Sequence, residues 1–278
     1  MREQVYQHKI FRESNEGEWY LLIPIADIHV GNPLFDRDKF EEIIEWMSKV
    51  YDKGLRDGMF DIPPRHIFWV GLGDYGDWIS SDPRDMRFML ETAEEMKPEE
   101  QFKYLRNWLG KIRHFCLGLI EGNHERKFYQ LNNVNFTRLL AEELDVPYLG
   151  SRATISLMFV RKGKHTINYL IHVAHPMTRA YTHIGLSRVA ERIIADVFAD
   201  VYLLGHTHRK LTGPKIRWIY DKKYGIFRKH KSVYAYAGSF LNPLKGDGYP
   251  DYKAYSPTDI GIVSIFLNAE RKDIHVLV

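Results

Sequence analysis

The chain has 278 residues, of which 45% are hydrophobic and 14% aromatic, and this composition excludes an intrinsically disordered protein. The formal net charge of +3 is mildly basic and permits an anionic substrate without indicating one. A single cysteine, Cys116, excludes a disulfide framework and a thiolate metal cage. The N-terminus lacks the apolar region of a signal peptide, and no apolar run is long enough to span a membrane. We therefore expect a cytoplasmic protein without a membrane partner.

The first half of the chain alternates predicted strands with predicted helices. Apolar runs bounded by turn residues predict strands at residues 5–11, 19–26, 67–70 and 115–120. Helices are predicted at residues 36–53, 82–96, 98–114 and 135–144. In the first helix, Phe40, Ile43, Ile44 and Met47 recur on one face, which we expect to be buried.

The second half of the chain is rich in strands. They are predicted at residues 154–160, 166–174, 201–204, 215–220, 232–237, 260–267 and 273–278, with one amphipathic helix at 186–199. No repeat or linker interrupts the chain, which predicts a single domain over residues 1–278 with a helical insertion at about 75–114. This order of elements indicates an α/β fold, a four-layer α/β/β/α sandwich of two mixed β-sheets flanked by helices.

Five apolar runs each end in side chains that can bind a metal ion. These side chains are Asp27 and His29, Asp74, Asn123, His175, and His206 and His208. Sites in open α/β sheets form at the carboxyl ends of strands, so the five ends can converge on one crevice. Carboxylate, imidazole and amide ligands without sulfur suit Mn²⁺, Fe²⁺, Zn²⁺ or Ni²⁺. Seven ligands exceed one tetrahedral site and suit two ions that share a bridging carboxylate.

Spacing separates the candidate ligands from other histidines. Asp27 and His29 lie two residues apart, so in an extended segment both side chains point to one side and can bind the same ion. His206 and His208 have the same spacing beside a glycine and could serve different ions. His172 lies three residues before His175, faces the opposite side of the strand, and is predicted to be structural.

The motifs, taken together and in this order, resemble those of the calcineurin-like metallophosphoesterase superfamily. They read Asp27-Ile28-His29, Gly73-Asp74, Gly122-Asn123-His124-Glu125, His175 and Gly205-His206-Thr207-His208. The resemblance covers residues 19–208 and implies the sandwich fold predicted above. It also implies two divalent metal ions, with Mn²⁺ preferred and Fe, Zn or Ni as alternatives.

The resemblance assigns a ligand set to each ion. One ion would be bound by Asp27, His29, Asp74 and His208. The other would be bound by Asp74, Asn123, His175 and His206, with Asp74 as the bridge. Such a pair of ions can hold a shared hydroxide for in-line attack on phosphorus.

The resemblance also assigns two catalytic side chains. His124 matches the histidine that stabilises the transition state or protonates the leaving group. Asp77 matches an aspartate that orients this histidine and raises its pKa. A simple turn cap is the alternative role for Asp77.

The chain departs from the protein Ser/Thr phosphatases of this superfamily. They place a phosphate-binding arginine directly after the second aspartate, where this chain has Trp78. Substrate selection is therefore expected from residues 75–114 and from the segment after His208. Arg126 and Arg209 adjoin predicted ligands and are the candidate substrate-binding residues. Trp78 or Tyr75 could stack on a base, with packing in the core as the alternative.

These observations predict a metal-dependent phosphoesterase that hydrolyses phosphodiesters, in nucleic acid or nucleotides. One alternative is a phosphomonoesterase acting on nucleotides or phosphoproteins. A non-catalytic scaffold with the same fold is disfavoured, because such scaffolds lose ligands and none is missing here. The expected partner is the phosphate-ester substrate, and the oligomeric state is not predicted.

Overall fold

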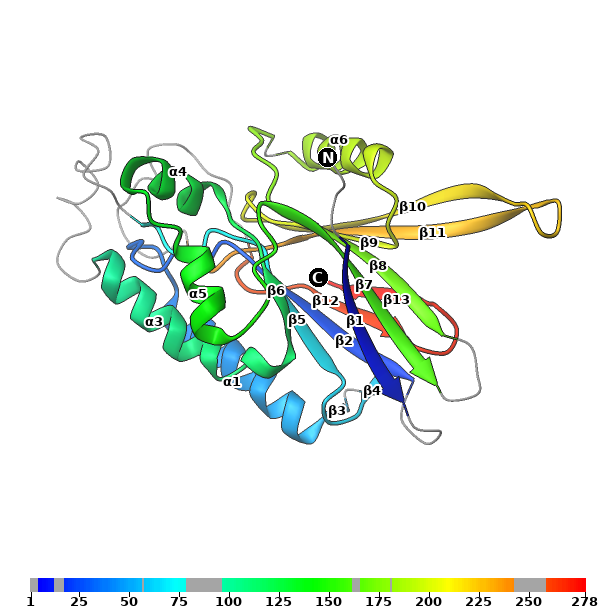
Figure 1. The fold of residues 1–278 in the computed structure, drawn as a ribbon, viewed down its shortest axis with the longest axis horizontal. Coiled ribbons are helices and arrows are strands. Elements are labelled where there is room, and N and C mark those ends of the chain that lie inside the picture. Colours follow the sequence, from blue (N-terminus) through cyan, green and yellow to red (C-terminus); the bar gives the residue numbers. More distant parts are fainter. Residues whose placement is uncertain are drawn as a thin grey trace.

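The computed structural model describes residues 5–12, 18–56, 58–78, 97–161, 166–180, 182–242 and 259–278. Its strands form a six-stranded and a five-stranded mixed sheet that pack together, with helices on the outside (Figure 1). Rings from the two sheets meet in the core, where Tyr20 and Phe159 lie 4.4 Å apart between centroids. The predicted α/β/β/α sandwich is confirmed.

The six-stranded sheet carries two of the predicted ligand segments. In spatial order it contains β1 (Val5–Arg12), β7 (Arg152–Arg161), β8 (Ile167–Ala174), β9 (Val201–Leu204), β11 (Ile226–Ala237) and β10 (Lys210–Asp221). Strands β8 and β9 are parallel, with Ala174 opposite Leu204. His175 and the loop that holds His206 therefore leave the sheet at the same edge.

The five-stranded sheet carries the other three ligand segments. Its order is β13 (Ile274–Leu277), β12 (Ser264–Asn268), β2 (Trp19–Ile25), β5 (Ile67–Gly71) and β6 (Cys116–Leu119). The last three strands are parallel, with Ile25 opposite Gly71 and Gly71 opposite Leu119. Asp27, Asp74 and Asn123 therefore follow the carboxyl ends of adjacent strands. A separate two-stranded sheet joins β3 (Leu55–Arg56) to β4 (Asp61–Ile62).

Helices cover both outer faces of the sandwich. Helices α1 (Arg37–Lys53), α3 (Pro98–Gly110) and α5 (Phe136–Leu144) lie over the five-stranded sheet, and α6 (His183–Asp196) lies over the six-stranded sheet (Figure 1). A short 3₁₀ helix, Arg113–Phe115, precedes β6, and α4 (Asn123–Asn132) follows it. The apolar residues predicted on one face of α1 are buried. None of the helices that the structure describes is long and apolar enough to cross a membrane.

Some predicted elements differ from the structure. Helix α4 was not predicted, and the predicted strands at 215–220 and 232–237 are parts of one long hairpin, β10–β11. The predicted strand at 260–267 begins at Ser264. Within the predicted insertion at 75–114, α3 is present, whereas the predicted helix at 82–96 lies outside the described residues. The single-domain organisation stays a prediction.

Two glycines allow the loops after β5 and β6 to touch. A Cβ on Gly73 would lie 2.3 Å from the backbone nitrogen of Gly122, and a Cβ on Gly122 would lie 2.1 Å from Oδ1 of Asp74. Only residues without a side chain permit this approach. The Gly-Asp and Gly-Asn motifs are therefore in direct contact.

Replacing Gly73 by alanine is expected to destabilise the protein more than the same change at Gly150. Their φ angles of +89° and +76° each cost an alanine about 1–2 kcal/mol. A Cβ on Gly73 would in addition clash with Gly122, whereas a Cβ on Gly150 meets no described atom within 4 Å. Urea unfolding of both variants measures the difference in the free energy of unfolding. Equal losses would contradict the close contact of the two loops.

Candidate metal centre

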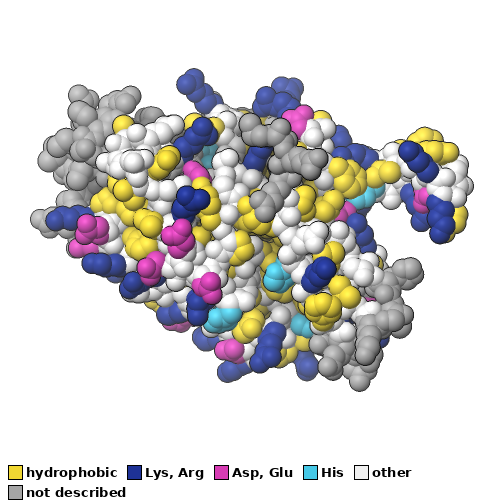
Figure 2. Space-filling model, viewed as in Figure 1, with side chains coloured by type: hydrophobic (Ala, Val, Ile, Leu, Met, Phe, Trp, Pro, Cys, Tyr) yellow, Lys and Arg dark blue, Asp and Glu magenta, His cyan; other side chains and the backbone are white. Residues whose placement is uncertain are grey.

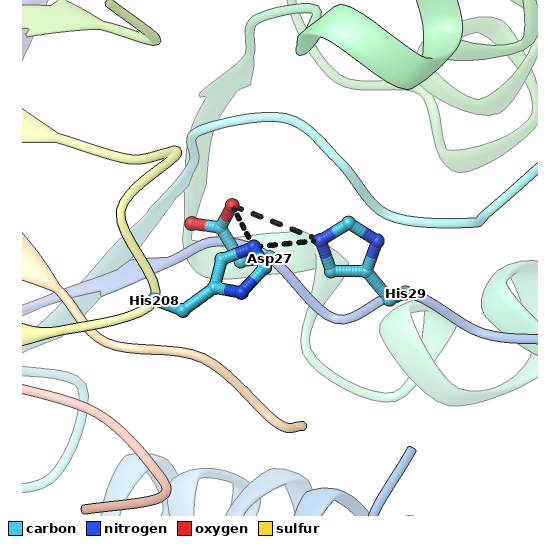
Figure 3. Close-up of side chains that lie close together, drawn as sticks. All are labelled: Asp27, His29 and His208. Carbon is cyan, nitrogen blue, oxygen red and sulfur yellow. Dashed lines mark hydrogen bonds and ion pairs between the residues drawn. The ribbon is translucent and has the colours of Figure 1, made fainter. Parts of the chain in front are cut away.

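The seven predicted ligands converge at one edge of the sandwich. The ligand atoms of Asp27, His29 and His208 all lie within 4.8 Å of one another (Figure 3). The same holds for Asp74, His175 and His206. These two groups come from segments up to 181 residues apart in the chain, and each contains three of the four ligands predicted for one ion. The binding of the ions stays a prediction.

The first group brings two imidazoles against one buried carboxylate. Nε2 of His208 lies 3.4 Å from Oδ1 of Asp27 and 3.1 Å from Nε2 of His29. Figure 3 shows these atoms pointing toward one another. Asp27 is fully buried, and the backbone N–H of His206 donates to its Oδ2 at 2.9 Å. A carboxylate held in this way presents its charge to the two rings.

The second group is organised around Asp74 and the amide of Asn123. Oδ2 of Asp74 lies 3.2 Å from Nε2 of His175 and 3.9 Å from Nε2 of His29, so this oxygen faces both groups. Oδ1 of Asn123 lies 3.1 Å from Nε2 of His175 and 2.6 Å from Nδ1 of His206. The backbone N–H of His124 donates to the other oxygen of Asp74 at 2.9 Å. Asp74 therefore lies between the two groups, and its role as a bridging ligand stays a prediction.

Hydrogen bonds behind three of the rings fix which nitrogen faces the centre. Nδ1 of His175 donates to the carbonyl of Leu72 at 2.7 Å, and Nε2 of His206 donates to the carbonyl of Thr178 at 3.1 Å. A carbonyl only accepts, so in the neutral form of both rings the nitrogen that carries the lone pair points inward. Nδ1 of His29 similarly lies 2.7 Å from a carboxylate oxygen of Asp77. Rings held in this way are preorganised to bind metal ions.

The amide of Asn123 supports the same conclusion. Its oxygen faces the inward nitrogens of His175 and His206, and a metal ion between these acceptors, or a proton on a ring, would relieve their opposition. With the amide turned over, its nitrogen would donate to the same two ring nitrogens and to Asp74. The turned orientation needs lone pairs on both ring nitrogens and suits neutral rings, whereas an oxygen that faces the rings suits a site that holds protons or metal ions. The residues present therefore fit a divalent ion.

The centre is strongly anionic, and this shifts the pKa values of its groups. Burial lowers the pKa of His29, but its hydrogen bond to Asp77 and nearby carboxylates raise it to about 9. Burial also lowers the pKa of His175, but the charge of Asp74 outweighs this effect and raises the pKa to about 10. Burial raises the pKa of Asp74, yet His175 and His124 hold it well below its usual value. Without metal ions, protons on the imidazoles balance the carboxylates.

The backbone at the centre is held in an uncommon conformation. Five of the seven predicted ligands have a positive φ, namely Asp27, His29, Asp74, His206 and His208. They are half of the ten non-glycine residues with this geometry in the described part of the chain. Such residues are uncommon and cluster at functional sites, where the surrounding structure determines their conformation. This clustering marks the centre independently of its side chains.

Asp77 has a different main partner from the one predicted. Its carboxylate lies 2.7 Å from Nδ1 of His29 and accepts from the side-chain amide of Asn32 at 2.9 Å. The corresponding distance to Nδ1 of His124 is 3.7 Å. The ring of His124 instead donates from Nδ1 to the backbone carbonyl of Asp77 at 3.1 Å. Asp77 therefore orients a predicted ligand with its side chain and orients His124 with its backbone.

Glu125 is a further residue of the centre, to which the motifs assigned no role. Its fully buried carboxylate accepts four hydrogen bonds, from the backbone N–H groups of Asp74, Tyr75 and Gly122 and from the indole N–H of Trp78, at 2.7–2.9 Å. The side chain thus ties the loop after β5 to the loop after β6. The signal was present, since a glutamate three residues after an N-cap position is typical of a capping box.

The remaining predicted residues have mixed outcomes. Tyr75 and Trp78 are buried, and Trp78 stacks on Phe136 at 4.2 Å, so both have the packing role and neither is open to a base. Arg126 is exposed on α4, and Arg209 is half-buried beside the centre. Their role in binding substrate stays a prediction. His172 is buried and lies 3.1 Å from the hydroxyl of Thr154, which confirms its structural role.

No protein-family model and no curated protein matches the chain. Solved structures with a similar arrangement include a metallophosphoesterase from Sphaerobacter thermophilus, at 14% identity and a TM-score of 0.37, covering 93% of this chain and 88% of that one. Vacuolar Protein Sorting 29 from Cryptosporidium parvum matches at 11% identity and a TM-score of 0.32, covering 94% and 97%.

A third similar structure is a predicted phosphoesterase from Streptococcus pneumoniae. It matches at 12% identity and a TM-score of 0.32, covering 94% of this chain and 99% of that one. At these identities and TM-scores the likeness bears on neither activity nor substrate, which must be inferred from the site itself.

Replacing Glu125 by glutamine is expected to lower the free energy of unfolding by about 1–3 kcal/mol. The amide NH₂ would face buried N–H donors that now bind a carboxylate oxygen, and each unsatisfied donor is costly. Chemical denaturation measures the loss. Glu142→Gln, at an exposed position on α5, is the matched control. Equal stability of the two variants would contradict the role of Glu125 in joining the loops.

Metal binding is expected to release protons. Below pH 9 both His29 and His175 are protonated in the metal-free protein, whereas an imidazole must be neutral to bind a metal ion. Loading with Mn²⁺ at pH 7 should therefore release about two protons per chain, and the affinity should rise with pH up to about 9–10. Calorimetric titrations in buffers of different ionisation enthalpy count the protons. Binding without proton release would show that these rings are not ligands.

Proposed function

We propose that the protein is a metal-dependent phosphoesterase of the calcineurin-like metallophosphoesterase superfamily. Two divalent ions, with Mn²⁺ the first candidate, would be bound by the ligand sets of Asp27, His29 and His208 and of Asn123, His175 and His206, with Asp74 between them. The observation that carries this proposal is the convergence of all seven ligands, with ring nitrogens turned inward by hydrogen bonds from behind. When bound, the ions supply positive charge that neutralises a phosphate and activates water for attack on phosphorus.

His124 is the proposed acid of the reaction. It belongs to a third close group with His29 and Asp74, and its side chain is 35% exposed, so a substrate can reach it. Because Nδ1 donates to the carbonyl of Asp77, Nε2 is the atom left to contact a substrate oxygen. From there it can donate a proton to the leaving group or a hydrogen bond to the phosphate.

Phosphodiesters are the proposed substrate class. The position at which the protein phosphatases carry an arginine is occupied by Trp78, which is buried and donates to Glu125. Because this side chain supports the loops, no cation at that position can bind the one additional negative charge that a monoester dianion carries relative to a diester. A monoesterase is the second candidate function, and the exposed Arg126, two residues after His124 on α4, is the feature that favours it.

A non-catalytic scaffold is the least consistent reading. Removal of selection for metal binding would leave no reason to keep seven ligands, their hydrogen-bond partners and a strained backbone together. Asp77, which hydrogen-bonds to His29 on the side away from the centre, is in place, and so is Asn32, which donates to Asp77.

Turnover of two aryl phosphates tests the proposed activity. With Mn²⁺, bis(para-nitrophenyl) phosphate should be hydrolysed faster than para-nitrophenyl phosphate. Equal or inverted rates would contradict the preference for diesters, and no hydrolysis of either ester with any of the four metals would contradict the enzyme assignment. The readout is the release of nitrophenolate by the full-length protein.

His124→Ala is expected to slow turnover of the diester by about 10²–10⁴-fold while the metal content stays unchanged. The variant cannot donate the proton, and kcat therefore falls. The metal content should not change, because His124 contacts predicted ligands and is not itself predicted to be one. His114→Ala, at an exposed position near α3, is the control. Metal analysis of the variant decides its role, since loss of an ion would make His124 a ligand.

A further inference from the structure

A long hairpin projects from the sandwich at the end of the six-stranded sheet. Strands β10 and β11 pair over their whole length, and residues 215–231, here called the arm, extend away from the body (Figures 1 and 2). Its root is fixed, because Arg217 donates to the carbonyl of Ile194 at 3.2 Å and Lys231 donates to the carbonyl of Ile274 at 3.2 Å. Beyond these anchors the arm reaches into solvent.

The arm exposes an unusual number of large apolar side chains. They are Ile216, Trp218, Ile219, Tyr220, Tyr224, Ile226 and Phe227. Trp218 is 67% and Phe227 65% exposed. Residues directly opposite in an antiparallel pair share a face, which places Trp218 beside Lys229 and Tyr220 beside Phe227, with the latter ring centroids 5.5 Å apart. Aromatic and cationic side chains thus share one face of the ribbon.

The arm is also strongly basic. It contains seven Lys and Arg residues and a single acidic residue, Asp221, whereas the rest of the chain holds 32 Lys and Arg against 35 Asp and Glu. Arg228 pairs with Asp221 at 2.7 Å. Lys222 and Lys229 are exposed and have no carboxylate partner among the residues that the structure describes. The net positive charge of the protein therefore resides on this one projection.

We propose that the arm binds nucleic acid. Cations that track a phosphate backbone, interleaved with rings on which bases stack, are the means by which proteins bind single strands. A two-stranded ribbon also fits the major groove of a duplex. An interface with another protein is disfavoured by charge, because lysine is depleted from the centres of protein–protein interfaces.

The position of the arm links this binding to the candidate centre. Strand β10 begins at Lys210, two residues after the predicted ligand His208. Twelve residues at about 3.3 Å each give a ribbon of roughly 35–40 Å, the length of about ten stacked nucleotides. The inference names the substrate class of the proposed phosphodiesterase and rests on that function, although binding can be measured without hydrolysis.

Binding is tested with the full-length protein in EDTA, where no metal-dependent hydrolysis occurs. Fluorescence anisotropy measures Kd for labelled 30-nucleotide probes, as single-stranded DNA, duplex DNA and single-stranded RNA, over a range of salt concentrations. The triple variant Lys222→Gln, Lys223→Gln, Lys229→Gln should weaken binding at least about tenfold and lower the salt slope by about 2–3. Trp218→Ala should weaken single-strand binding by about tenfold and leave the salt slope unchanged.

The control variant removes three exposed lysines from the body, at Lys9, Lys49 and Lys103. It should bind as the wild type does. Hydrolysis of bis(para-nitrophenyl) phosphate should be unchanged in all variants, which shows that they fold and separates this inference from the proposed function. If the aryl diester is hydrolysed but the arm and body variants bind the probes equally, the arm inference is wrong and the phosphoesterase stands.

Two further results would overturn the inference. One is a Kd that does not depend on salt or on the arm for any of the three probes. The other is a change in the sedimentation of the protein itself when the arm is substituted, with probe binding unaltered. That result would make the arm an interface between copies of the chain. Loss of binding confined to one probe type supports the inference and identifies the nucleic acid.

Discussion

The buried carboxylate of Glu125 is the interaction on which the candidate centre most depends. It collects N–H groups from the loop after β5 and the loop after β6, so the two motifs that supply Asp74 and Asn123 cannot separate. The contact requires glycine at positions 73 and 122, because any side chain there would enter the opposite loop. Parallel strands bring the loops to one edge, and this carboxylate fixes their distance. The parallel strands and the Glu125 carboxylate together therefore determine where the predicted ligands lie.

A concentration of negative charge is the second organising feature. Asp27 and Asp74 are fully buried and lie close to the same histidine rings. A buried charge is unstable unless an opposite charge compensates it. In the metal-free protein the compensation comes from protonated His29 and His175. Divalent ions would replace those protons at the same atoms. The network that compensates the buried carboxylates with protons is therefore the network that would bind the metal ions.

Much of the fold and most of the centre could be predicted from the sequence. Hydrophobic periodicity located α1 and the parallel strands, and the joint occurrence of short motifs at five strand ends identified seven side chains that the structure brings together. The partner of Asp77 could not be predicted, since it depends on the turn that places Asn32 and His29 beside it. Glu125 was present in the pattern, but only the structure shows that its partners include the loop of Asp74.

The arm is a part of the fold that the sequence patterns did not predict as one hairpin. Its strands were predicted as separate short segments, because exposed aromatic and basic residues on both faces hide the alternation that marks a half-buried strand. Pairing along the whole hairpin is a tertiary property, and so is the exposure of its aromatic side chains. The concentration of charge was visible in the sequence, whereas its exposure was not.

The central claim is that the centre holds two ions that share Asp74. Anomalous diffraction at the manganese edge, from crystals of the protein grown with Mn²⁺, tests it most directly. The account predicts two peaks roughly 3.5–4 Å apart, with Asp74 between them. A single peak, or none at this edge of the sandwich, would contradict it.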